Sequence, residues 1–190
     1  MESRPNMHDL DTHRKDRDLI SICRSDIDAH AIQGFVLGCS RELVVLQYVY
    51  DFNLDGLMVL RTADVTEVRC TATGKLQKDL LLQEGLAQKV PFAFTLDLSG
   101  WGAVISQLAK AYALMILECE ARKRKEFVIG RVLKTTPREV HIHHFSGAAN
   151  WAKRPTRLKL SDITSCQVDT NNLNVYQRHF ERNGPLVKKQ

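Results

Sequence analysis

The chain has 190 residues, of which 44% are hydrophobic and 26% are charged, a composition that supplies enough apolar area for a folded core and excludes wholesale disorder. Its apolar runs are far shorter than the roughly 20 residues that a membrane-spanning helix needs, so we expect no membrane association. Lysine and arginine exceed aspartate and glutamate by 27 − 22 = 5, an excess that permits contact with nucleic acid or with an acidic partner without requiring it.

The N-terminal segment and the cysteines bear on the compartment. Residues 1–15 are polar and charged with no apolar stretch behind them, which is not the pattern of a secretory signal. The five cysteines are odd in number and contain no Cys-x-x-Cys pair, which favours reduced thiols in a core over zinc or redox chemistry. We therefore expect a cytoplasmic protein without a cofactor, and we expect the polar ends, residues 1–17 and 185–190, to fray.

Short strands and turns make up the first half of the chain. Leu43–Leu46 is rich in β-branched and aliphatic residues and lies between turn-forming segments, which predicts a strand. The dipeptide Asp55-Gly56 is typical of a tight turn and precedes a predicted strand at Leu57–Arg61. The spacing of leucines over Lys78–Leu86 predicts a short helix that closes this half.

A connector leads to the second half. Residues 88–98 contain Pro91 and bulky side chains, and we interpret them as an ordered connector. Residues 99–112 carry apolar residues at helical spacing, with Ser99 placed to cap a helix. Val140–His143 alternates strictly, so the valine and the isoleucine should face inward and the histidines outward. A second tail helix is predicted over Tyr176–Glu181.

The two halves match each other in sequence. The matching segments are 32–46 with 129–143, and 60–68 with 158–166. Gly34 falls on Gly130 at an offset of 130 − 34 = 96, and Asp64 falls on Asp162 at an offset of 162 − 64 = 98. We interpret the nearly constant offset as a duplication. The alternative is a pair of β-hairpins that look alike because strands share composition.

The predicted architecture follows from the duplication. We expect a mainly β protein with a few helices, in the α+β class, built as two five-stranded barrels in tandem. The first barrel spans 18–86, the connector and helix span 87–111, and the second barrel spans 112–184. Glycines inside strand patterns mark bends or bulges, and aspartates before threonine cap turns. The structural residues by these criteria are Gly34, Gly56, Asp64, Gly130 and Asp162.

These motifs resemble a known family. Residues 32–70 carry Ile-x-Gly-x-Val-Leu, then Ser-x-Glu-Leu-Val-Val-Leu, then Phe-x-Leu-Asp-Gly-x-x-Val-Leu-Arg, then Asp-Val-Thr-Glu-Val. This pattern is similar to the Sm-like branch of SH3-type barrels, in particular to uncharacterised bacterial proteins with this domain. Residues 129–168 carry it less clearly. The resemblance implies a bent five-stranded sheet, usually preceded by a helix, that often assembles through strand edges and often binds RNA.

The chain departs from this family at its uridine-binding elements. Where the family carries Asp-x-x-x-Asn, the turns here read Ser40-Arg-Glu and Thr136-Pro-Arg-Glu. Where it carries Arg-Gly or Lys-Gly after the fourth strand, this chain has Arg69-Cys70-Thr71 and Gln167-Val168-Asp169. The resemblance therefore implies the fold and does not extend to the family's RNA pocket.

Three histidines form a conspicuous polar group at His141, His143 and His144. Two histidines at i and i+2 lie on one face of a strand and would ligate zinc if a third ligand came from elsewhere. The other interpretation is an exposed strand face, and the positions that correspond in the first half, Val44 and Leu46, are apolar. A metal-dependent activity at His141 and His143 is the weakest hypothesis that we carry forward.

Two basic segments in the second half suggest nucleic acid. Their residues are Arg122, Lys123, Arg124 and Lys125 in one segment, and Trp151, Lys153, Arg154, Arg157 and Lys159 in the other. An aromatic ring among cations is the combination that stacks on bases and contacts phosphates. The alternative is a solvated turn whose tryptophan packs on the barrel.

Catalysis finds little support in the sequence. No Gly-x-Ser-x-Gly elbow and no phosphate-cradling glycine loop occur in the chain. We therefore expect a non-enzymatic module that binds or assembles through its sheet edges, with a protein partner or with itself. RNA or single-stranded nucleic-acid binding by the second half is the alternative.

Overall fold

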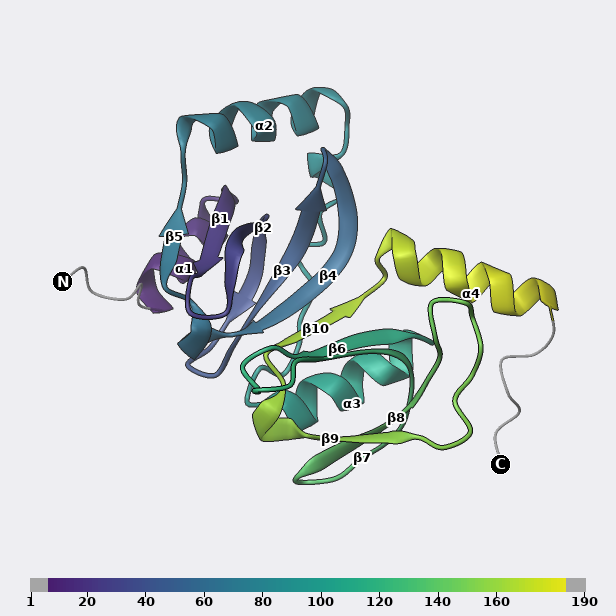
Figure 1. Cartoon of the computed structure of the whole chain (residues 1–190). Coiled ribbons are helices and arrows are strands. Elements are labelled where there is room, and N and C mark those ends of the chain that lie inside the picture. The colour runs from purple at the N-terminus through teal and green to yellow at the C-terminus, as the bar shows by residue number, and fades with distance from the viewer. Residues whose placement is uncertain (1–6, 184–190) are drawn as a thin grey trace.

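The computed structural model describes residues 7–183 and is mainly an antiparallel sheet with four helices, which is the predicted α+β class (Figure 1). The predicted fraying of residues 1–6 and 185–190 concerns segments outside the described residues. No helix within 7–183 combines the length and the apolar character that crossing a bilayer requires.

The first half contains two helices and five strands, which are α1 (Met7–Lys15), β1 (Leu19–Arg24), β2 (Asp28–Cys39), β3 (Leu43–Tyr50), β4 (Asn53–Arg61), β5 (Glu67–Arg69) and α2 (Ala72–Gln83). The second half repeats this order with α3 (Trp101–Ala111), β6 (Met115–Cys119), β7 (Glu126–Thr135), β8 (Glu139–His144), β9 (Thr156–Lys159), β10 (Ser165–Val168) and α4 (Asn171–Asn183). One-turn 3-10 helices follow β4, α2 and β9, at Thr62–Asp64, Ala87–Lys89 and Leu160–Asp162.

The ten strands form one open sheet. Their order is β5-β1-β2-β3-β4-β10-β6-β7-β8-β9, so the fifth strand of each half pairs with the first strand of that half, and β4 pairs with β10. The seam between the halves consists of four residue pairs, which run from Ser165 opposite Leu60 to Val168 opposite Leu57. Figure 1 shows the two halves meeting where β4 lies against β10.

The largest hydrophobic cluster belongs to both halves. It joins one face of the first half, represented by Phe35 and Val59, to the interior of the second half, represented by Val140 and Leu158, and it includes the buried side of α3. A second cluster lies under α1, and a third lies under α4. Because the main core is continuous across the seam, we expect the halves to unfold together.

A buried ion pair also crosses the seam. The Arg24 guanidinium donates two hydrogen bonds to the Glu120 carboxylate, at 2.7 and 3.0 Å, and Arg24 is only 3% exposed. The buried Thr164 hydroxyl donates to the same carboxylate at 2.7 Å. The Nε of Arg24 has no hydrogen-bond partner among the described residues. Glu120 therefore supplies the carboxylate that compensates the buried positive charge of Arg24.

Two glycines sit at equivalent crowded positions. A Cβ on Gly34 would lie 2.6 Å from the carbonyl oxygen of Gln47, and a Cβ on Gly130 would lie 2.1 Å from that of His143. Just past each glycine the pairing of β2 with β3, and of β7 with β8, shifts by one residue. The sequence predicted a bend or bulge at the glycines themselves, whereas the register shifts lie between Val36 and Gly38 and between Val132 and Lys134.

The predicted turn at Asp55-Gly56 is wrong. β4 already begins at Asn53, and the chain reverses at Asp51 and Phe52, whose φ values are +46° and +59°. Gly56 has φ +75° inside β4, and a Cβ there would lie 2.3 Å from the carbonyl oxygen of Val168. Gly56 is therefore needed because β10 approaches closely, a contact that local sequence does not reveal.

The helices differ from prediction mainly at their ends. Residues 7–15 form α1, although the sequence predicted fraying there, because Leu10 is buried to 1% exposure against the first half. α2 begins at Ala72, before the predicted start, and Thr71 caps it by accepting a hydrogen bond from the Gly74 amide. The helix predicted over 99–112 is present as α3, but Gly100 takes the cap position in place of Ser99.

Candidate functional site

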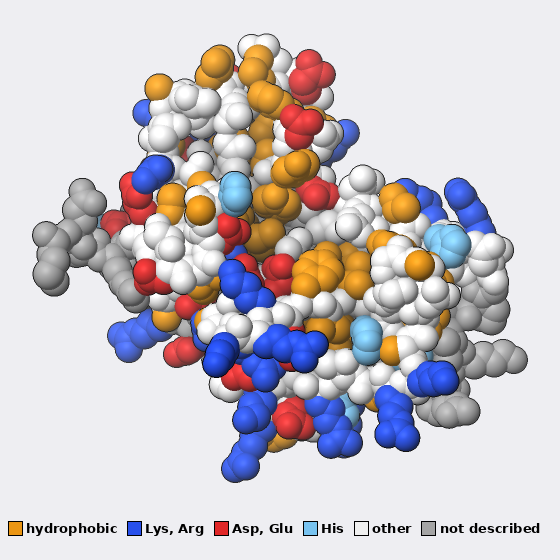
Figure 2. All heavy atoms as spheres, in the orientation of Figure 1, with side chains coloured by type: hydrophobic (Ala, Val, Ile, Leu, Met, Phe, Trp, Pro, Cys, Tyr) orange, Lys and Arg blue, Asp and Glu red, His pale blue; other side chains and the backbone are white. Residues whose placement is uncertain are grey.

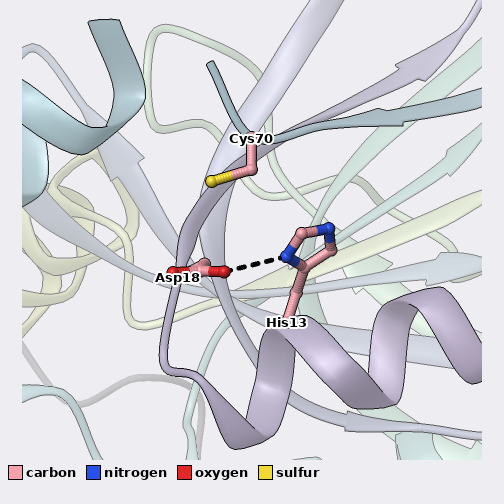
Figure 3. A group of neighbouring side chains, drawn as sticks. All are labelled: His13, Asp18 and Cys70. Carbon is pink, nitrogen blue, oxygen red and sulfur yellow. Dashed lines mark hydrogen bonds and ion pairs between the residues drawn. The ribbon is translucent and has the colours of Figure 1, made fainter. Parts of the chain in front are cut away.

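Three side chains of metal-binding type meet beside α1. They are His13, Asp18 and Cys70, and one ligand atom from each lies within 4.8 Å of the others. The Nδ1 of His13 is 2.9 Å from an oxygen of Asp18, and Figure 3 shows the thiol of Cys70 directed toward the same space. Within residues 7–183 this is the only group of three or more histidine, cysteine or carboxylate donors with that proximity.

The end of α1 fixes two of these residues. The amide of Asp18 donates to the carbonyl of His13 at 3.0 Å, and the amide of Arg17 donates to the carbonyl of Arg14 at 3.2 Å. Arg17 has φ +51°, so these two hydrogen bonds and the left-handed Arg17 form a Schellman ending of the helix. The guanidinium of Arg17 lies 4.8 Å from the ring centre of Phe92, which further holds this turn.

The surroundings of the cluster contain one lysine in direct contact. The Nζ of Lys78, from α2, lies 3.2 Å from Oδ1 of Asp18, while Oδ2 faces His13. Burial acts to raise the pKa of Asp18, but the hydrogen bonds from His13 and Lys78 outweigh it and lower the pKa. Burial and the charge of Asp18 raise the pKa of the Cys70 thiol. The two shifts favour the ionised carboxylate at Asp18 and the protonated thiol at Cys70.

The predicted histidine pair lies elsewhere, on β8. His141 is 3.7 Å from a Glu139 oxygen, and His143 Nε2 is 2.8 Å from the carbonyl oxygen of Ala152. His144 contacts the hydroxyl of Thr156 at 3.1 Å. His141 and His143 are not part of the donor group described above, and sequence inspection missed His13, Asp18 and Cys70 because they are separated along the chain.

The register of the strands shows which residues of β3 correspond to the histidines of β8, and it differs from the correspondence expected from the sequence. Gly34 pairs with Tyr48, and Gly130 pairs with His144. His141 and His143 therefore correspond to Val45 and Gln47, and not to Val44 and Leu46. A slip of one residue exchanges the two faces of a strand. The face that carries imidazoles in the second half is thus the face that is buried against the connector in the first half.

The predicted basic residues lie on neighbouring parts of the second half. Arg122 is 3.0 Å from Glu126 and 3.6 Å from Asp162, so the β6–β7 turn lies beside the turn that follows β9. We define the basic strip as the exposed cations of that turn together with those on β9 and just before it, namely Arg122, Lys123, Arg124, Lys125, Lys153, Arg154, Arg157 and Lys159. Figure 2 shows lysine and arginine side chains gathered on the lower part of this half.

Most of the basic strip has no side-chain partner within the described part of the chain. Arg122 is ion-paired, and Lys125 donates to the carbonyl of Ile27 at 3.5 Å. The other six cations make no side-chain hydrogen bond or ion pair with residues 7–183. Their charge is therefore available to an external anion.

Trp151 is not an exposed stacking platform. The centre of its ring lies 4.9 Å from the ring centre of Phe180, 5.1 Å from that of Phe145 and 4.8 Å from that of His143. It belongs to the cluster that seats α4. Phe127, which sequence inspection did not single out, is 59% exposed on β7, two residues after Lys125.

The two halves carry opposite charge. Residues 18–86 contain 6 lysines and arginines and 10 aspartates and glutamates, a balance of 6 − 10 = −4. Residues 112–183 contain 13 and 7 of these, a balance of 13 − 7 = +6. The overall excess of five cations conceals this asymmetry.

The two ends of the sheet are short strands. β5 has three residues and β9 has four, and each pairs with one other strand among the described residues. Pro155 precedes β9, and Arg157 and Lys159 project from it. Proline and charge at an edge discourage pairing with another strand.

Compared with known protein families, with curated proteins and with solved structures, the chain shows no match.

Proposed function

We propose that the chain is a non-enzymatic cytoplasmic binding module whose second half binds single-stranded nucleic acid, with RNA as the expected ligand, through the basic strip. The observation that carries the proposal is the set of six exposed cations that have no side-chain partner among residues 7–183, on a half of charge +6. Cations that no carboxylate neutralises attract a phosphate backbone and release its counterions on binding.

An exposed aromatic ring on β7, two residues after the last cation of the β6–β7 turn, favours single strands over duplex. Phe127 exposes 59% of its surface next to the β6–β7 turn. A base stacked on such a ring contributes about 1–3 kcal/mol and needs no particular sequence. A duplex keeps its bases stacked on one another and cannot use this contact.

The architecture that we propose for this module is two Sm-like barrels in tandem. Its support is the repeated element order, in which the fifth strand of each half pairs with the first, and the crowded glycine at the same place in each half. In this interpretation β4 and β10 fuse the two barrels into the single open sheet.

Assembly through the sheet edges is the other function that the sequence suggested. At β9 the edge residues argue against it, because Pro155, which precedes the strand, lacks an amide donor and because Arg157 and Lys159 put two exposed charges on the edge strand. The same two cations favour a polyanion. The geometry of β9 therefore supports nucleic acid over a protein strand at this end of the sheet.

A binding measurement with charge-reversed variants tests the proposal. A labelled single-stranded RNA is titrated with the protein, and fluorescence anisotropy is read at low salt. The variant Arg157→Glu/Lys159→Glu should bind at least about 10-fold more weakly, because several phosphate contacts are lost or reversed. The matched control is Arg41→Glu/Lys75→Glu, which changes the net charge equally at two exposed cations of the first half. The control should bind like the unaltered protein.

Two outcomes would contradict the proposal. One is equal weakening in both variants, which would show attraction by net charge alone. The other is absence of RNA binding together with a cellular partner that is retained after nuclease digestion, which would assign the strip to a protein.

A further inference from the structure

We propose that His13, Asp18 and Cys70 form a zinc-binding site that clamps α1 to the junction of β5 and α2. The donors would be Nδ1 of His13, one carboxylate oxygen of Asp18 and the thiolate of Cys70, with water in the fourth position. This site is separate from the basic strip and does not depend on the proposed nucleic-acid function.

The donor set matches the preferences of zinc. Zinc binds imidazole nitrogen, thiolate sulfur and carboxylate oxygen at about 2.0–2.3 Å in tetrahedral geometry. Ligand atoms in such a tetrahedron are roughly 3.3–3.8 Å apart. The three donors here lie within 4.8 Å of one another, so side-chain rotations of about 1 Å bring them to ligand distance.

The backbone already holds the donors in place. The Schellman ending of α1 places Asp18 beside His13 through the 3.0 Å hydrogen bond between their backbone groups. Cys70 is fixed from the other side, because it lies between β5 and Thr71, the residue that caps α2. A metal ion would therefore meet donors from three segments without rearrangement of the fold.

Lys78 acts as an outer partner of the site. Its Nζ lies 3.2 Å from Oδ1 of Asp18. The other oxygen, Oδ2, is directed toward His13 (Figure 3). A hydrogen bond from outside the coordination sphere orients a ligating carboxylate. Zinc with one thiolate and one carboxylate is electrically neutral, so the nearby ammonium group does not face a net positive site.

Metal binding changes the protons on two of the three ligands, Cys70 and His13. The Cys70 thiol loses its proton to solvent when sulfur binds the metal. Neutral His13 must present Nδ1 without hydrogen, so its proton moves to Nε2 and the present contact with Asp18 is replaced by two metal bonds. The proton that leaves on binding is thus the one carried by the Cys70 thiol.

The clamp would add a metal link to a helix that packs on β2 mainly through Leu10. α1 has nine residues, too few to be helical alone in water, and Leu10 is its one buried hydrophobic residue among those described. A bond from His13 to a metal shared with Cys70 would join the helix to the sheet.

Titration with Co²⁺, a spectroscopic substitute for zinc, tests the proposal. The full chain should show a thiolate-to-cobalt absorption band that saturates at one equivalent and disappears when Zn²⁺ is added. Cys70→Ser should abolish the band. His13→Ala should weaken binding at least about 10-fold, since loss of even an outer partner of a metal site costs 10–100-fold.

Two matched controls separate the site from incidental binding. Cys39→Ser removes a thiol that also lies near α1, close enough for the charges of Asp11 and Arg14 to act on its pKa. His30→Ala removes a histidine paired with Asp28 at 3.1 Å but without the neighbouring thiol. Both variants should bind Co²⁺ like the unaltered chain. In the unaltered protein, Zn²⁺ should also slow hydrogen exchange of the α1 amides.

The proposal is overturned if the folded chain shows no thiolate-to-cobalt band, or if the band survives Cys70→Ser. It is equally overturned if Cys39→Ser or His30→Ala reduces affinity as much as His13→Ala. Circular dichroism of each variant establishes that it is folded, and His13→Ala provides the second test if Cys70→Ser does not fold.

Discussion

The variant Glu120→Gln should strongly destabilise the protein because it leaves the charge of Arg24 buried without its partner. The side chain of Arg24 is 4% exposed and that of Glu120 is 16% exposed. Removing one member of a buried ion pair costs about 3–5 kcal/mol. We expect a value near the lower limit of that range, about 3 kcal/mol, because water reaches part of the Glu120 side chain.

Urea unfolding followed by circular dichroism measures this cost. For a slope of roughly 1–3 kcal/mol per molar urea, the midpoint should fall by about 1 M or more. The matched control is Glu126→Gln, which breaks the pair of Glu126 with Arg122, whose side chains are 30% and 43% exposed. That pair should contribute less than about 1 kcal/mol. Equal effects of the two variants would refute the claim that the seam depends on a buried charge pair.

Three further predictions concern the core and the sheet. Burial raises the pKa of Glu118, despite a hydrogen bond from Ser165. The folded state therefore holds the proton of Glu118 more tightly than the unfolded state does, and the free energy of unfolding falls as the pH rises through the raised pKa. Glu118→Gln should remove that loss, seen as a higher urea midpoint at pH 7 and an unchanged one at pH 4. Gly130→Ala should cost about 1–3 kcal/mol or more in thermal unfolding because the Cβ meets a carbonyl oxygen at 2.1 Å, whereas Gly100→Ala, whose Cβ meets nothing within 4 Å, should change little. Leu10→Ala should cost about 2–5 kcal/mol by urea unfolding, and no effect would mean that α1 is not docked.

The sequence predicted the strands well where burial alternates. Val140 and Ile142 face inward and are fully buried, as the alternation required. Gly34 and Gly130 were identified as special positions because a lone glycine within an apolar strand marks a bulge or a bend, but the crowding by the neighbouring strand is visible only in the structure. Alternation and strand glycines can be recognised from neighbouring residues alone, and in these strands the tertiary contacts favour the same structure as the local sequence.

Other features depend on contacts between distant residues. α1 is polar over most of its length, and it folds because the side chain of Leu10 packs into the hydrophobic cluster of the first half. Gly56 looked like a turn residue, but it is required by the approach of β10 from the other half. The group formed by His13, Asp18 and Cys70 could not be read from spacing, because β5 brings the cysteine back beside the first strand.

The basic strip was only partly predictable. The cations stand out in the sequence, and their exposure follows from their charge. Trp151 looked like a stacking residue, yet Phe145 and Phe180 surround it with aromatic rings. Phe127 carries no sequence signal beyond its neighbours, since strand phenylalanines are usually buried.

The salt dependence of RNA affinity tests the central claim most directly. If the basic strip contacts phosphates, the logarithm of the association constant should fall linearly with the logarithm of salt concentration, with a slope of about −0.7 for each contact. Arg157→Glu/Lys159→Glu should make the slope less steep by at least about 1.4, which corresponds to two lost contacts. A slope that is unchanged in this variant, or an affinity that does not respond to salt, would contradict the account.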